Sequence, residues 1–141
     1  MKTLVVSAVS IVLVNILFCP MVMAAPSMPA DLQIVQPDPS LPKELSAFFG
    51  KWEGRGKINY FLIVEKIDEE KASLYIWELA PESGAPIWSR YEAQVIKERG
   101  QYKLWYTGRF GKPTLTLKGE VLNWSTVSYT GSESVRLSRA P

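Results

Sequence analysis

The chain contains no histidine, and Cys19 is the single cysteine among its 141 residues. The missing histidine excludes Ser-His-Asp and Cys-His nucleophilic sites and removes the usual general base near neutral pH. Zinc and copper sites of the ordinary His/Cys kind are excluded for the same reason, and one cysteine cannot form a disulfide within the chain. We therefore expect no enzyme activity, no metal and no cofactor. Chemistry based on carboxylates alone is the one catalytic route left open.

A strong excess of either charge is also lacking. Lys and Arg total 16 against 14 Asp and Glu, a formal net charge of +2, and this balance argues against a nucleic-acid partner. Phosphate-binding glycine loops are lacking too, because Gly54-Arg55-Gly56 fits neither the Walker nor the Rossmann spacing of glycines. The composition, 47% hydrophobic and 21% charged, is that of a globular protein, and the length suits one domain.

Residues 1–24 have the layout of a secretory signal peptide. Lys2 precedes an apolar run from Leu4 to Phe18, and Pro20 is followed by a short stretch that ends with Ala24. We predict cleavage after Ala24 and a secreted or periplasmic protein that makes no membrane contact after cleavage.

Two other interpretations of this segment remain open. The stretch from Thr3 to Ala30 carries no charge and is long enough for an uncleaved membrane anchor, since about 20 apolar residues span a bilayer. Alternatively, Cys19 is a lipid-modified first residue, although the bulky Phe18 precedes it. Cleavage after Ala24 leaves no cysteine, so the fold then depends on core burial alone.

Prolines dominate the next segment, residues 25–40. Proline removes backbone donors and favours extended chain, so we interpret this segment as an arm that serves as a spacer outside the core, with a binding role as the alternative. The prolines here and just beyond are Pro26, Pro29, Pro37, Pro39 and Pro42.

A short helix is predicted after the arm. Ser40 is a suitable N-cap, and proline at position 42 is tolerated in a first turn. Leu41, Leu45 and the phenylalanines at 48 and 49 recur at helical spacing, and Gly50 is a suitable stop. We expect about two turns, packed against the strands that come after the helix.

Beyond Gly50 the pattern is that of eight short strands separated by turn residues. None of the gaps has room for a crossover helix, so neighbouring strands must be antiparallel hairpins. Closure removes the sheet edges, so we predict an all-β fold over residues 41–141, a small eight-stranded antiparallel up-and-down barrel preceded by a short helix. The segments are Lys51–Lys57, Asn59–Ile67, Ala72–Leu79, Ile87–Lys97, Tyr102–Tyr106, Thr114–Lys118, Val121–Tyr129 and Ser134–Ser138.

One of these segments is apolar on both faces. In Ala72–Leu79, Leu74 and Ile76 share one face, while Tyr75 and Trp77 share the other. Such a strand needs cover on both sides, which we expect from the short helix or from a partner.

The run Gly50-Lys51-Trp52-Glu53-Gly54, with the later runs 63–68 (IVEKID) and 75–77 (YIW), resembles exported bacterial lipocalin-like (calycin) small barrel domains over residues 41–140. The resemblance implies that Trp52 closes one end of the barrel and that an arginine near the end of the last strand packs across its ring. Arg136 and Arg139 are the two candidates for this structural plug. Strands this short leave open whether the interior is hollow or filled by side chains.

Aromatic residues are the strongest candidates for a binding site, because tryptophan and tyrosine combine a large apolar area with a polar tip. We predict non-covalent binding of a small apolar or amphipathic molecule in the barrel. The alternative is a filled barrel that binds a protein, for example as an inhibitor or accessory partner of a secreted hydrolase. The predicted lining residues are Tyr75, Trp77, Tyr91, Tyr102 and Tyr106.

Two glutamates lie on apolar strand faces. Glu65 is flanked by Ile63 and Ile67, and Glu78 shares its face with Leu74 and Ile76. Each is either a general acid or polar anchor in a pocket, or a member of a salt bridge at the rim, where a cation such as Arg90 meets it.

Overall fold

The computed structural model describes residues 25–56, 58–80, 82–109, 111–128 and 131–141. The predicted signal segment and Cys19 lie outside these residues, as does most of the stretch considered as an alternative anchor. Within them, no helix has the length and apolar character needed to cross a bilayer.

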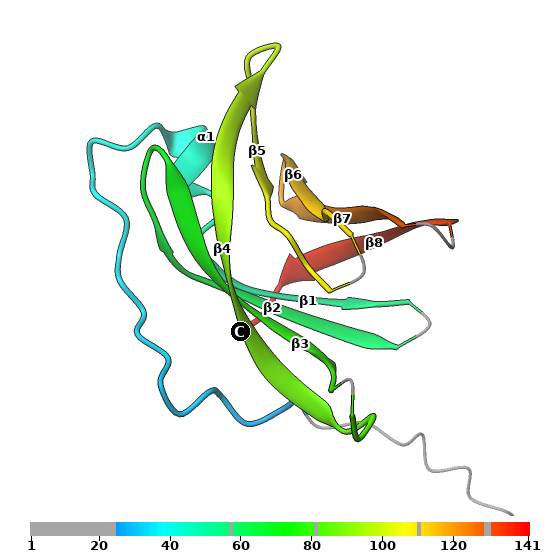
Figure 1. The fold of residues 1–141 in the computed structure, drawn as a ribbon. Coiled ribbons are helices and arrows are strands. Elements are labelled where there is room, and N and C mark those ends of the chain that lie inside the picture. The colour runs from blue at the N-terminus through cyan, green and yellow to red at the C-terminus, as the bar shows by residue number, and fades with distance from the viewer. Residues whose placement is uncertain (1–24, 57, 81, 110, 129–130) are drawn as a thin grey trace, which may run out of the picture.

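The described residues form a closed barrel of eight antiparallel strands preceded by one short helix, which confirms the predicted fold (Figure 1). Each strand pairs with the next, and the last strand returns to the first through the pairs Trp52↔Arg139 and Glu53↔Ser138. The elements are α1 (Lys43–Ser46), β1 (Gly50–Arg55), β2 (Asn59–Ile67), β3 (Lys71–Leu79), β4 (Pro86–Glu98), β5 (Gln101–Trp105), β6 (Thr114–Lys118), β7 (Val121–Ser128) and β8 (Gly131–Arg139).

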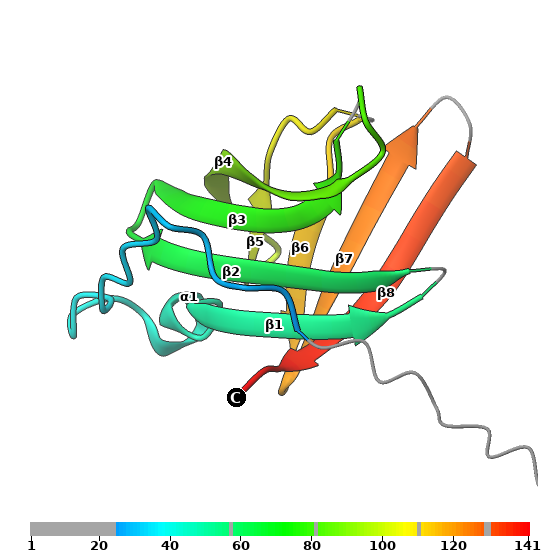
Figure 2. The ribbon, with the colours of Figure 1, turned by 90° about the horizontal axis from the view of Figure 1, so that it is seen from below.

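The barrel has two different ends. The closed end carries α1 and the β2–β3, β4–β5 and β6–β7 turns, and the open end carries the other four connections (Figures 1 and 2). Along β4, residues 86–94 pair with β3, but only residues 94–98 pair with β5. Because this ladder stops halfway, β4 and β5 separate toward the open end, where the barrel widens.

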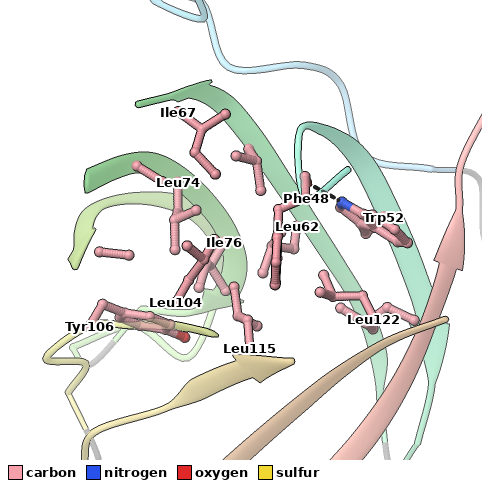
Figure 3. Close-up of a cluster of buried hydrophobic side chains, with 14 of the residues drawn as sticks. Phe48, Trp52, Leu62, Ile67, Leu74, Ile76, Leu104, Tyr106, Leu115 and Leu122 are labelled. Atoms are coloured by element: carbon pink, nitrogen blue, oxygen red, sulfur yellow. Dashed lines mark hydrogen bonds between the residues drawn. The ribbon is translucent and has the colours of Figure 1, made fainter. Parts of the chain in front are cut away.

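Side chains fill the closed half of the barrel. Alternate residues of every strand point inward, and the largest aliphatic ones meet at the centre (Figure 3). A close-packed interior of this kind leaves no room for a ligand there. The strand leucines and valines with no more than 2% of their surface exposed are Leu62, Val64, Leu74, Leu104, Leu115, Leu122 and Leu137.

A tryptophan and an arginine seal the closed end. Trp52 is buried, and its indole Nε1 donates a hydrogen bond to the Phe48 carbonyl, 2.9 Å away. The Arg139 guanidinium carbon lies 4.0 Å from the centroid of the indole ring. The same guanidinium donates to the carbonyls of Phe49 and Ala47, the latter at 2.5 Å. The plug therefore also ties the segment after α1 to the barrel.

Of the two candidate arginines, Arg139 occupies the position over the ring. Arg136 is exposed and lies between the inward-facing Val135 and Leu137, so strand alternation puts its side chain on the outer face. Gly50 makes the arrangement possible, because it has a φ of +116° and a Cβ there would lie 2.8 Å from Nη1 of Arg139.

The helix is shorter than predicted, with one turn instead of two. Ser40 does not cap it, because its backbone N–H and its hydroxyl both donate to the Asp38 carboxylate, at 2.8 and 2.7 Å. Such a local turn prevents the serine from capping the helix. Pro42 takes the cap position, and after Ser46 the chain continues in tighter turns, with the Phe48 N–H bonded to the Leu45 carbonyl.

The proline-rich arm is docked on the barrel, which corrects its interpretation as a spacer. It runs along the outer face of the β1–β4 wall (Figure 2). The Val35 N–H donates to the Glu65 carbonyl at 2.8 Å, and the indole N–H of Trp88 donates to the Ser27 carbonyl at 2.7 Å. The arm thus supplies the outer cover that the sequence required for β3 but assigned to the helix or a partner.

Replacing Trp52 by alanine is expected to lower the free energy of unfolding by about 3–5 kcal/mol, because a fully buried ring is removed from the closed end. Arg139→Ala removes the cation over that ring and its two carbonyl contacts, and should cost about 1–2 kcal/mol.

Denaturant titration measures both changes. Arg136→Ala is the matched control and should stay within about 0.5 kcal/mol of the parent protein. Equal losses for the two arginine variants would contradict the assignment of Arg139 to the plug.

Candidate functional site

A pocket of about 430 Å³ occupies the open end of the barrel. Ile76 and Tyr106 form its floor, since both are buried members of the core and also line the pocket. The other inward-facing residues that line it are Tyr60, Glu78, Arg109, Trp124, Thr126 and Glu133. The separation of β4 from β5 positions this pocket, because the two parts of the wall diverge above the packed leucines.

The β5–β6 connection forms one side of the pocket. Its backbone turns through the bridge between Gly108 and Gly111. At Gly111 the φ is +146°, and a Cβ would lie 2.7 Å from the Val127 carbonyl oxygen. Only glycine allows this close approach, so the connection packs directly on β7.

Aromatic rings form a connected wall. Tyr60 and Trp124 have ring centroids 5.7 Å apart and planes inclined by 41°. The indole N–H of Trp124 donates to the Tyr106 hydroxyl at 2.8 Å, and the Tyr106 ring lies 4.9 Å from that of Tyr91. These contacts hold the rings in fixed positions, as a preformed binding wall requires.

Two carboxylates face the same pocket, and each is bonded to a tyrosine. Glu78 Oε1 accepts a hydrogen bond from the Tyr91 hydroxyl at 2.6 Å, and Glu133 Oε1 accepts one from Tyr60. Burial, and secondarily the bond to Glu78, raises the pKa of Tyr91 to about 12. Burial likewise raises the pKa of Tyr60, with the bond to Glu133 adding to the effect. Both phenols therefore stay protonated and remain donors at neutral pH.

A cation and an unpaired hydroxyl complete the lining. Arg109 donates from Nη1 to the Leu79 carbonyl at 2.6 Å, and its Nη2 lies 4.0 Å from Glu78 Oε1. The buried Thr126 Oγ1 has no hydrogen-bond partner among the residues that the structure describes. A buried polar atom without a partner is uncommon, and a ligand group would satisfy it.

The five predicted lining residues do not come together. Tyr106 lines the pocket. Tyr91 does not line it, but its ring packs against the Tyr106 ring. Tyr102 also packs against the core, from the closed-end part of β5, with Lys97 Nζ 4.8 Å from its ring.

Tyr75 and Trp77 point their rings outward from β3, which corrects their placement inside the barrel, although Trp77 also borders the open-end pocket. Tyr75 is 2% exposed because the arm covers its side of β3, and the Arg90 guanidinium lies 5.5 Å from its ring. The Trp77 ring packs on Trp88 of β4, 5.3 Å away on the same outer face. Inward-facing side chains on β3 have even numbers, so a one-residue difference in parity reversed both assignments.

Several pocket residues were missed by the sequence analysis, notably Tyr60, Trp124, Thr126 and Glu133. A usable signal was the parity of neighbouring leucines: Tyr60 shares a face with Leu62, and Trp124 with Leu122. The sequence does not show which of these inward positions lie at the open end, beyond the half of the barrel that side chains fill.

Glu65 belongs to a salt bridge outside the pocket, as the second of its two interpretations predicted. Its carboxylate is almost fully buried, pairs with Arg90 and accepts the Gln33 N–H of the arm at 3.1 Å. This group therefore holds the arm against the barrel.

Comparison with protein families, with curated proteins and with solved structures finds no match. The lipocalin-like resemblance therefore stays a prediction, and the function must be argued from geometry. Within the described ranges, no group of three or more His, Cys, Asp or Glu side chains is placed to hold a metal ion.

The raised pKa values of the buried tyrosines should make the free energy of unfolding depend on pH in the alkaline range. In the unfolded chain tyrosine ionises near pH 10, whereas Tyr91 in the barrel ionises near 12. Between these values the unfolded state has lost protons that the folded state retains, so stability falls as pH rises from about 10 to about 12. Denaturant midpoints across this range, with tyrosinate absorbance as a second readout, test the expectation. Tyr91→Phe should flatten part of the fall, and an unchanged midpoint between pH 10 and 12 would contradict the burial of these phenols.

Proposed function

We propose that this protein is an exported, lipocalin-like carrier or sensor that binds one small apolar or amphipathic molecule non-covalently in the open-end pocket. The observation that carries the proposal is the pocket of about 430 Å³ above a filled core, with aromatic walls and a few polar groups. Small-molecule sites are concave, mostly apolar and roughly 300–1,000 Å³ in volume, and their few polar groups orient the ligand.

The filled lower half limits what the ligand is. Because packed leucines occupy the closed half, the ligand extends only from the floor at Ile76 and Tyr106 to the rim. A compact molecule, or the terminal part of a longer chain, fits such a site better than a fully enclosed long chain.

Apolar side chains at the rim support an apolar or amphipathic ligand. Ile58, Leu79 and Ile87 are between 39% and 49% exposed. Ile58 and Leu79 line the pocket, and Ile87 lies at the open end of β4, opposite the pocket residue Glu78 of β3. Exposed apolar residues that gather at a concave site are typical of a ligand entrance.

The described residues give no positive sign of catalysis, so binding without chemistry is the simplest function for the site. Export remains part of the proposal because residues 1–24 have signal-peptide character in sequence.

A second candidate function is protein binding through the outer face. A groove of about 460 Å³ lies beside the open end and is lined mainly by apolar residues, including Phe61, Trp77, Leu79 and Pro86. An inhibitor or accessory partner of a secreted hydrolase would use such a groove, whereas a carrier would use the interior.

A neutral fluorescent probe, N-phenyl-1-naphthylamine, separates the two functions. We expect it to bind with one-to-one stoichiometry, to quench tryptophan fluorescence and to raise the melting temperature. At about 100 times Kd, ligand binding adds about 2.7 kcal/mol of stability.

The variant Thr126→Trp places a large side chain in the pocket and should reduce probe affinity at least tenfold. Ile96→Trp, on the exposed part of β4 near the closed end, is the matched control and should bind as the parent does. Folded parent protein that fails to bind the probe, or Thr126→Trp that binds it equally well, would contradict the carrier proposal.

A further inference from the structure

Glu78 and Glu133, the two acids of the open-end pocket, each have a second carboxylate oxygen that could accept a hydrogen bond from a ligand. Among the described residues, the hydrogen bonds to Glu78 and Glu133 use Oε1 of each carboxylate, and Oε2 of each takes no part in them. An ionised carboxylate accepts hydrogen bonds only, at about four lone-pair positions. A ligand group that donates hydrogen bonds therefore finds two acceptors on opposite parts of the wall, one from β3 and one from β8.

Arg109, the cation among the described lining residues, is committed to the protein. It donates to the Leu79 carbonyl, and its other terminal nitrogen is directed at Glu78. Of the charged side chains in that lining, Glu78 and Glu133 carry two negative charges and Arg109 one positive charge. An anionic ligand head would therefore enter a pocket that already carries an excess negative charge.

The aromatic wall adds to this preference. The rings of Tyr60 and Trp124 lie side by side in the pocket wall, and the Tyr60 hydroxyl is bonded to Glu133, which lines the same pocket. Ring faces attract cations that come within about 6 Å of the centroid, and tryptophan does so most strongly. Thr126 lines the same pocket, and its Oγ1 has no hydrogen-bond partner among the described residues, so a ligand N–H would satisfy it.

From these three features together we infer that the pocket selects amphiphiles with a positively charged, hydrogen-bond-donating head, such as an alkylammonium, against carboxylates of the same length. The inference rests on the proposed ligand-binding function and specifies the ligand class. The head lies between Glu133, Glu78 and the rings, and the apolar part contacts Ile76 and the rim.

Three probes with the same twelve-carbon chain test the inference at pH 7.5, below their micelle-forming concentrations: dodecylamine, dodecanol and dodecanoate. Each is used to displace N-phenyl-1-naphthylamine from the full barrel. We expect dodecylamine to bind at least tenfold more tightly than dodecanoate, with dodecanol between them. The preference should shrink as salt is added, because it is partly electrostatic.

Variants assign the preference to the two acids. Glu133→Gln and Glu78→Gln keep an acceptor oxygen for the tyrosine but remove the charge, so each should weaken dodecylamine at least threefold and leave dodecanol within twofold. Glu92→Gln is the matched control, since Glu92 is an exposed acid on the outer face of β4, paired with Lys71. It should change neither affinity.

The outcomes distinguish this inference from the function on which it rests. If dodecanol binds but dodecanoate binds as tightly as dodecylamine, or if neither glutamate variant alters the ratio, the charge preference is wrong and the carrier function stands. If none of the three displaces the neutral probe, or the probe itself does not bind, both are overturned.

Discussion

Closure of the barrel depends on one short seam. Among the described residues, β1 and β8 pair at Trp52↔Arg139 and Glu53↔Ser138, and the Ala140 N–H donates to the Lys51 carbonyl just beyond. At that point the Arg139 guanidinium also covers the Trp52 ring and holds two carbonyls of the segment after α1. The pair Trp52–Arg139 is therefore the point at which the last strand, the first strand and the segment after the helix meet. Because a cation over an indole face and two charge-assisted hydrogen bonds act together there, the seam is stronger than two ladder pairs alone.

The contrast between the two halves of the barrel follows from this seam. Strands that are drawn together at the closed end bring their inward leucines into contact and exclude water from that half. Toward the open end β4 leaves β5, and the inward positions are occupied by groups with polar tips, such as Tyr60, Glu78 and Glu133. Each of these polar tips has a hydrogen-bond partner within the wall, so the open half stays accessible without leaving its tyrosines and acids unsatisfied.

The sequence was sufficient for the strand order because hairpin turns and two-residue alternation are local signals. It was sufficient for the interior positions of Tyr91 and Tyr106, since Ala93 and Leu104 fix the parity of their strands. It failed for Tyr75, because β3 is apolar on both faces and nothing local indicates which face is the interior. The arm decides which face of β3 is the outer one, and its hydrogen bond from Gln33 to Glu65 joins residues that are 32 positions apart in the chain.

The depth of the pocket was also beyond local reasoning. Whether a barrel is hollow depends on how far the pairing between neighbouring strands continues. The sequence of β4 has the pattern of one uninterrupted strand, although among the described residues only positions 94–98 pair with β5, and positions 86–93, toward the open end, do not. Alternation therefore assigned faces to residues such as Tyr102 without revealing that it lies below the level of the site.

The docked arm makes β3 the middle layer of a three-layer wall, with the core on one side and residues 25–40 on the other. Its central residues, from Leu74 to Ile76, are buried on both faces, whereas β8 alternates regularly between buried and exposed positions. Related sequences should therefore vary freely at the outward positions of β8, while β3 stays nearly fixed from Leu74 to Ile76. An evolutionary record of this protein would show the barrel as two arcs that change at unequal rates.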